Sequence, residues 1–172
     1  MMKKYYISTR KLNEDRYSYL QDILEDDTLD ENNFYSFLLQ LPETKFIIVS
    51  NEELNQESEA IVSTIHDAGM NNDNLSIEET DKNIVVLDIN KLKELKHEYL
   101  KEIFDFPDYY GKNLDALYDC LSELDDTEIV IVNMKDIDDF SLDVINVFND
   151  VMDEYNNLTI TYQDENEEDS YE

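Results

Sequence analysis

Glycine, proline, cysteine and tryptophan are scarce or absent in this chain of 172 residues, and the scarcity limits what it can do. With only two glycines, Gly69 and Gly111, the chain cannot build the glycine-rich loop that cradles the phosphates of a nucleotide. Its single cysteine, Cys120, cannot form an intramolecular disulfide, and such a chain fits a reducing compartment.

Long apolar runs are missing as well. Lys3 and Lys4 stand near the N-terminus, but no apolar stretch of signal-peptide length follows them. No segment approaches the length of a membrane span. We therefore expect a cytoplasmic protein without a membrane partner.

Basic residues are few: 13 lysines and arginines face 43 aspartates and glutamates, which gives a formal net charge of −30. This balance excludes ordinary nucleic-acid binding, because phosphates would be repelled. A charge of this size speeds encounter with basic partners. It would equally serve to keep a surface soluble.

Catalytic constellations are also lacking. His66 and His97 are far apart, have no cysteine or histidine at metal-ligand spacing, and are expected on solvated helix faces. Cys120 lies on a leucine stripe, where a small buried hydrophobe is the expected role, although a Cys–His pair remains open. We predict no enzymatic activity, no metal, no cofactor and no small-molecule substrate.

The chain reads as two copies of one unit. A shift of 80 residues aligns three pairs of segments: Lys11-Leu12 with Lys91-Leu92, Tyr19-Leu20 with Tyr99-Leu100, and Asn33 with Asn113. After Leu41 a shift of 83 aligns two apolar runs: Phe46–Val49 with Ile129–Val132, and Leu75–Ile77 with Leu158–Ile160. One three-residue insertion therefore relates the copies over nearly their whole length, which favours a tandem duplication.

Apolar runs of strand length alternate with helical stripes in each copy. Tyr5–Ser8 and Ile84–Ile89 are strand-like, whereas Tyr19–Leu24 and Leu92–Phe104 carry apolar residues at helical spacing. Phe46–Val49 is the kind of unbroken apolar run found in buried strands of parallel sheets. Strands separated by helices predict an α/β fold, with a small parallel β-sheet packed with helices in each of two tandem copies.

We expect residues 1–80 to form the first unit and residues 81–163 the second. The acidic tail, residues 164–172, has no core-forming residues and is expected to be disordered.

One segment of the second copy stands apart, Pro107-Asp-Tyr-Tyr-Gly-Lys-Asn-Leu-Asp-Ala-Leu-Tyr-Asp-Cys-Leu121. Pro107 and Gly111 mark a loop, and Asn113 is suited to cap the helix that follows. The apolar side of that helix would consist of Leu114, Leu117, Cys120, Leu121 and Leu124.

The other side of this helix would carry Asp115 and Asp119, four residues apart, with Tyr118 beside them. Tyr109 and Tyr110 precede the helix in a loop, where packing does not obviously need aromatic side chains. The combination suits an acidic and aromatic surface directed at a basic cleft. Solvated aspartates and locally packed tyrosines are the alternative.

The segment Pro107–Leu121 resembles the most characteristic motif of the barstar family, the bacterial intracellular inhibitors of barnase-type ribonucleases. The resemblance covers about Ile84 to Tyr162 and implies a barstar-like fold. In the family, this loop and helix enter the ribonuclease active site, where acidic side chains take the places of RNA phosphates. Two departures are Tyr118, which stands where the family usually has tryptophan, and the segment after Leu121.

The resemblance implies an antitoxin or immunity protein that occludes a basic ribonuclease, either of an extracellular type or a toxin. Asp119 would be the central anion, and Asp150 on the third helix would take the place of a family glutamate. The other partner-binding residues would be Tyr109, Tyr110, Gly111, Asn113, Leu114, Asp115 and Tyr118.

The first copy does not keep the motif. Leu29, Glu31, Tyr35 and Leu39 stand at the positions of Tyr109, Gly111, Asp115 and Asp119. The apolar residues at these positions would suit an interface, so this degenerate copy is expected to be a scaffold or to bind something else.

Two other functions remain open. A nucleic-acid mimic needs carboxylates spread over its surface, and an interaction module could retain the fold without inhibiting a nuclease. The concentrated motif favours an inhibitor.

Overall fold

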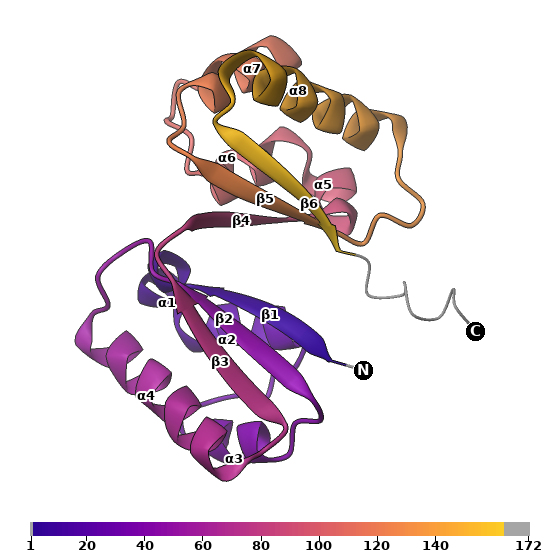
Figure 1. Ribbon diagram of the computed structural model, residues 1–172. Helices are drawn as coiled ribbons and strands as arrows, with labels where there is room; N and C mark the ends of the chain where they lie inside the picture. Colours follow the sequence, from indigo (N-terminus) through magenta and orange to yellow (C-terminus); the bar gives the residue numbers. More distant parts are fainter. Residues whose placement is uncertain (1, 164–172) are drawn as a thin grey trace. The chain divides into compact units, whose positions relative to one another are not determined.

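The computed structural model describes residues 2–163. The chain divides into two compact units, unit 1 (Met1–Lys82) and unit 2 (Asn83–Glu172), each with its own sheet and helices (Figure 1). The tail that was expected to be disordered, residues 164–172, lies outside the described residues.

Unit 1 contains seven elements in its described part. They are β1 (Lys3–Ser8), α1 (Thr9–Asp15), α2 (Tyr17–Leu24), α3 (Phe34–Leu39), β2 (Thr44–Val49), α4 (Gln56–Asn71) and β3 (Leu75–Thr80). Unit 2 repeats this order with β4 (Asn83–Asp88), α5 (Ile89–Leu95), α6 (His97–Phe104), α7 (Leu114–Ser122), β5 (Thr127–Val132), α8 (Asp139–Tyr155) and β6 (Leu158–Gln163).

Each unit has a three-stranded, fully parallel sheet, with strand orders β1-β2-β3 and β4-β5-β6. Helices make every connection between neighbouring strands, as parallel pairing requires. The central strands β2 and β5 are buried along most of their length, which explains their unbroken apolar runs. The predicted α/β fold class with small parallel sheets is confirmed.

The two units also agree in detail. Their elements follow the offsets seen in the sequence: β1 and β4 begin 80 residues apart, at Lys3 and Asn83, whereas β2 and β5 begin 83 apart, at Thr44 and Thr127. The backbone N–H of Ser8 donates to the Tyr19 hydroxyl at 2.9 Å. In unit 2, Asp88 N–H donates to the Tyr99 hydroxyl at 2.8 Å. Equivalent polar contacts at equivalent positions support two copies of one structural unit.

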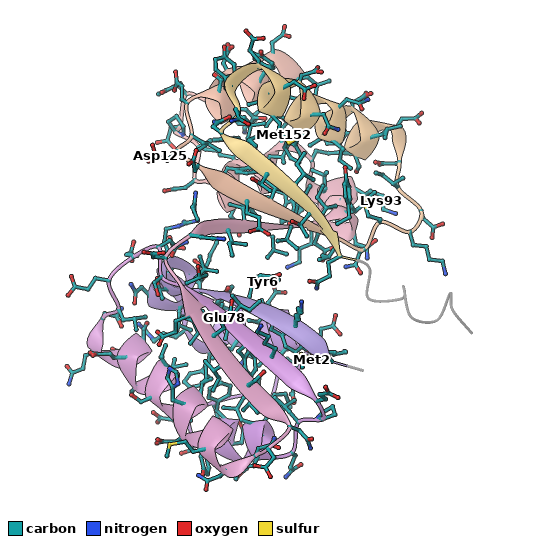
Figure 2. All side chains as sticks on the ribbon, in the orientation of Figure 1. Met2, Tyr6, Glu78, Lys93, Asp125 and Met152 are labelled. Atoms are coloured by element: carbon teal, nitrogen blue, oxygen red, sulfur yellow. The ribbon has the colours of Figure 1, made fainter. Side chains whose placement is uncertain are left out.

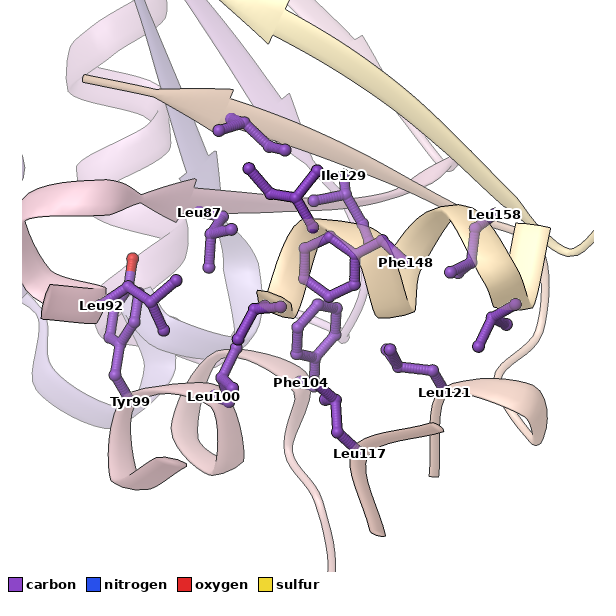
Figure 3. Close-up of a cluster of buried hydrophobic side chains, with 14 of the residues drawn as sticks. Leu87, Leu92, Tyr99, Leu100, Phe104, Leu117, Leu121, Ile129, Phe148 and Leu158 are labelled. Carbon is purple, nitrogen blue, oxygen red and sulfur yellow. The ribbon is translucent and has the colours of Figure 1, made fainter. Parts of the chain in front are cut away.

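Apolar side chains fill the space between helices and sheet in each unit and form two separate clusters (Figure 2). In unit 2, Phe104 stacks on Phe106 with ring centroids 5.3 Å apart and meets Phe148 edge-on at 6.0 Å. Leu117 and Leu121 of α7 are fully buried in the same cluster (Figure 3). This cluster therefore holds α7 against the rest of unit 2.

One asparagine side chain caps the C-terminal end of α3 in unit 1 and of α7 in unit 2; Asn72 is buried and Asn157 is partly buried. Asn72 donates from Nδ2 to the carbonyls of Leu38 and Leu41 at 3.0 and 3.2 Å. Asn157 makes the same two contacts in unit 2, to Leu121 and Leu124. Leu38 and Leu121 also accept from the backbone N–H groups of Leu41 and Leu124, so the amide adds a second donor at the end of each helix.

We expect Asn72→Ala to lower the free energy of unfolding by about 2 kcal/mol, because it removes the two side-chain hydrogen bonds to the carbonyls of Leu38 and Leu41. Urea unfolding of the full chain would show a lower midpoint. Asn146→Ala, at an exposed position on α8, is the control and should leave the midpoint unchanged or slightly raised. A loss below about 0.5 kcal/mol for Asn72→Ala would contradict the assignment.

Candidate functional site

The loop between α6 and α7 is shaped by turns and caps that the sequence specifies locally. Asp105 ends α6 in the left-handed conformation, with φ of 55°. Tyr110 N–H then donates to the Pro107 carbonyl at 3.0 Å, which closes a turn. Asn113 starts α7: its Oδ1 accepts from Ala116 N–H at 2.8 Å, which confirms the predicted N-cap.

Helix α7 presents its two sides as its spacing predicts. Leu117 and Leu121 are buried, whereas Asp115 and Asp119 are exposed on the other side, with Tyr118 partly exposed beside them. Asp115 lies in the first turn, where the positive end of the helix favours a carboxylate. The helix therefore holds two unpaired carboxylates toward solvent while its opposite side is fixed in the core.

The two loop tyrosines point in different directions. Tyr109 is 80% exposed. Tyr110 is 4% exposed, and its ring lies 4.9 Å from that of Phe106. The expectation that packing does not need the loop aromatics is therefore wrong for Tyr110, which supports the loop from inside.

His97 also departs from expectation. It was predicted on a solvated helix face, but it is half-buried, and its Nδ1 lies 2.6 Å from the Tyr110 hydroxyl oxygen. Burial lowers the pKa of His97 below its ordinary value. The spacing of its neighbours on α6 gave no indication of this contact, because Tyr110 comes from a different segment.

Helix α8 adds residues to the α7 surface. Tyr155 of α8 meets Tyr118 edge-on, with ring centroids 6.1 Å apart. The pKa of Tyr118 is raised, first by desolvation and then by Tyr155, Glu154 and Asp150. The fold thus brings Asp150 near Tyr118 of α7, although Asp150 lies 31 residues further along the chain than Asp119.

Sequence reasoning missed Tyr155 and Glu154. The signal available was that Asp150 and Glu154 are four residues apart on one helix, so both fall on one face. We call the exposed set Tyr109, Asp115, Tyr118, Asp119, Asp150, Glu154 and Tyr155 the acidic face.

Two lysines of this region are engaged with carboxylates. Lys112, in the loop, contacts Glu98 of α6, and Lys101 lies 3.3 Å from Asp108. Such exposed pairs stabilise little. They do offset nearby positive charge, so the acidic face keeps its negative character.

Cys120 does not have the character of a nucleophile. Its thiol is half-buried, and its pKa is raised by desolvation and by Glu123 and Asp119. A thiol of this kind stays protonated at neutral pH and reacts slowly. Within residues 2–163, no group of three or more His, Cys, Asp or Glu side chains is arranged to hold a metal ion. No described helix is long and apolar enough to cross a membrane.

In the described part of unit 1, Tyr35 and Leu39 stand where α7 carries Asp115 and Asp119, so this acidic pair is not repeated. Leu29 is 1% exposed and lies in the core of unit 1, and Leu39 packs against that core. The expected apolar interface is therefore wrong for Leu29, which is buried inside unit 1, whereas Leu39 is only partly buried and its part in an interface stays a prediction. Tyr35 is the exposed one, at 38%, and its hydroxyl accepts from Asn71 Nδ2 at 3.1 Å.

Comparisons with known proteins find a family for unit 2. A model of the family Barstar (barnase inhibitor) matches residues 82–168. A 39-residue stretch, 23% of the chain, is 54% identical to the protein named "Putative ribonuclease inhibitor YrdF" of Bacillus subtilis (strain 168). That stretch spans 43% of the relative's length, less than half. Because the family match takes in every element of unit 2 from β4 to β6, including the capped α7 and its two outward carboxylates, the chain belongs to the barstar family.

Proposed function

We propose that this chain inhibits a basic ribonuclease of the barnase type by inserting the acidic face into its active site, and that it catalyses nothing itself. The observation that carries the proposal is the orientation of α7. Asp115 and Asp119 are exposed, while Leu117 and Leu121 of the same helix are buried in the core.

The chemistry of the target explains why carboxylates would bind there. A ribonuclease cleft holds phosphate and must be cationic, so fixed carboxylates can replace the phosphates of RNA. The net charge of −30 would also speed encounter with a basic partner, and the effect would weaken as salt increases.

Rigidity supports the proposal further. Binding loses affinity when side chains and loops must be ordered on contact. Here α7 is already capped by Asn113 and anchored by its leucines, so little ordering remains. Asp119 is the proposed central anion, and Tyr109, at 80% exposure, is the proposed aromatic contact from the loop.

The other proposed contacts have narrower roles. Gly111 is exposed in the loop, and a Cβ there would lie 3.2 Å from that of Ala116, so a larger residue would crowd the start of α7. Asn113 is occupied as the N-cap and acts by fixing the helix. Leu114 is half-buried and would offer an apolar edge. The proposed place of action is the cytoplasm, where Cys120 would stay a thiol.

The first test is stoichiometry. Titrating barnase with the full chain should abolish RNA cleavage at a molar ratio of one to one, because each inhibitor molecule occludes one active site. The chain alone should not cleave RNA. Persistent full barnase activity at an equimolar, micromolar concentration of both proteins would exclude a barnase-type target.

The second test concerns the acidic face. Asp119→Ala and Asp115→Ala should each weaken binding to barnase by about 2 kcal/mol or more, roughly 30-fold, as central interface residues typically do. Thermal stability should change little, because both side chains are exposed.

Asp67→Ala is the matched control, since it removes one exposed carboxylate from α4 of unit 1 and should leave the affinity within twofold. Equal small losses for all three variants would indicate a diffuse charge effect, as expected of a nucleic-acid mimic, and would overturn the proposed site.

The third test concerns the role of the units. We propose that unit 2 carries the whole inhibitory surface and that unit 1 is a degenerate copy that does not contact the nuclease. A chain of residues 83–163 should therefore inhibit barnase with an affinity within about tenfold of the full chain. Calorimetry measures the affinity of the fragment and of the full chain for barnase. Loss of inhibition in a fragment that retains its helical circular dichroism would assign part of the surface to unit 1.

A further inference from the structure

The loop that carries Tyr109 rests on an aromatic layer with a histidine in it. His97, the first residue of α6, lies 5.7 Å from the Tyr110 ring and meets Phe140 edge-on at 5.2 Å, measured between ring centroids. The Phe106 ring also contacts Tyr110, with ring centroids 4.9 Å apart. Three chain segments, the start of α6, the loop and the start of α8, therefore meet at these rings.

A polar contact lies inside this layer. The Tyr110 hydroxyl would be expensive to bury without a hydrogen-bond partner. His97 provides one, with Nδ1 at 2.6 Å from the hydroxyl oxygen. The pKa of Tyr110 is raised by desolvation, so its hydroxyl keeps its proton near neutral pH. A neutral His97 can therefore accept a hydrogen bond from this hydroxyl at Nδ1.

The contact is placed to control the outer side of the loop. Tyr110 directly follows Tyr109, and Tyr110 N–H also donates to the Pro107 carbonyl at 3.0 Å. Fixing the Tyr110 ring therefore fixes the backbone from which Tyr109 projects. Asn113, the cap of α7, follows three residues later.

We propose that His97 is a positioning residue for the nuclease-binding surface, acting on Tyr109 through its hydrogen bond to Tyr110. This inference rests on the proposed function. His97 itself does not belong to the acidic face: it holds the loop from beneath.

The groups near His97 decide how the strength of the His97–Tyr110 contact changes with pH. Three ion pairs involve charged groups near His97 in the chain or on α6: Lys96 with Asp138 at 3.4 Å, Lys112 with Glu98, and Lys101 with Asp108 at 3.3 Å. The Lys96 ammonium also lies 4.8 Å from the centroid of the Phe140 ring. Hydrogen bonds from Ser141 and the nearby Lys96 hold the pKa of Asp138 at about 2. Lys112 lowers that of Glu98. Neither carboxylate therefore titrates between pH 5.5 and 7.5.

Among the groups of this layer, His97 is the one whose protonation is linked to opening of the loop. Its pKa lies below the ordinary value of 6.5 because burial disfavours the imidazolium. A histidine released from the layer takes up a proton more readily than the buried one, so the stability of the closed loop is lost as pH falls below 6.5. Inhibition should weaken in the same direction.

The experiment compares the full chain with His97→Leu and His97→Gln. Leucine keeps an apolar contact but removes the hydrogen bond, whereas glutamine restores a group that can pair with the Tyr110 hydroxyl. His66→Gln is the control, because His66 is a partly exposed histidine of unit 1 that pairs with Glu79. Two quantities are measured: hydrogen–deuterium exchange of the peptide 106–113, and inhibition of barnase at pH 7.5 and 5.5.

We expect His97→Leu to speed exchange of the loop peptide at least threefold and to weaken inhibition at pH 7.5 by about tenfold, with glutamine restoring both to within threefold. Acidification to pH 5.5 should weaken wild-type inhibition more than that of His97→Gln. Any titration of the nuclease itself cancels in this comparison. Tyr110→Phe should resemble His97→Leu, and the double variant should be no worse than either single one.

Wild-type exchange and inhibition in His97→Leu, or equal impairment by leucine and glutamine, would show that His97 does not position the loop. If the wild-type chain fails to inhibit barnase, the proposed function fails, and the exchange measurement by itself then decides the role of His97.

Discussion

The surface of unit 2 depends on the burial of Leu117 and Leu121 in the core beneath α7. A nine-residue helix is too short to be stable alone in water. Asp115 and Asp119, four residues apart, make it less stable still, because like charges at this spacing repel. Burial of the leucine side therefore stabilises α7. Because the leucines point into the core, the carboxylates on the opposite side point to solvent.

In the loop before α7, too, the burial of some side chains decides which neighbours are exposed. Phe106 and Tyr110 are buried and contact each other, and this leaves Tyr109 as the tyrosine presented to solvent. Helix α8 then contributes one aromatic residue to the core and another to the exposed surface. Phe148 lies in the core, whereas Tyr155 meets Tyr118 on the outside. One packed cluster thus orients aromatic and acidic groups from three segments of the chain.

The two units show how one scaffold carries different surfaces. Their strand order, offsets and the tyrosine hydroxyl contacts of Tyr19 and Tyr99 agree. They differ in the loop that precedes α3 in unit 1 and α7 in unit 2. In unit 1 the position equivalent to Tyr109 is Leu29, which is buried in the core of that unit. Interior contacts are kept because losing them would destabilise either unit, whereas exposed positions can change at little thermodynamic cost.

The sequence by itself determined the elements whose signals are local. The apolar runs of β2 and β5, the Asn113 cap and the opposed sides of α7 all follow from the spacing of neighbouring residues. The shift from 80 to 83 also predicted the repeated architecture, because both copies bury the same apolar positions. Only the tertiary structure decided which of two adjacent tyrosines is buried, that His97 meets Tyr110, and that Tyr155 meets Tyr118. These contacts join segments separated by 13 or more residues, and no periodicity along one element encodes the distance between side chains of two.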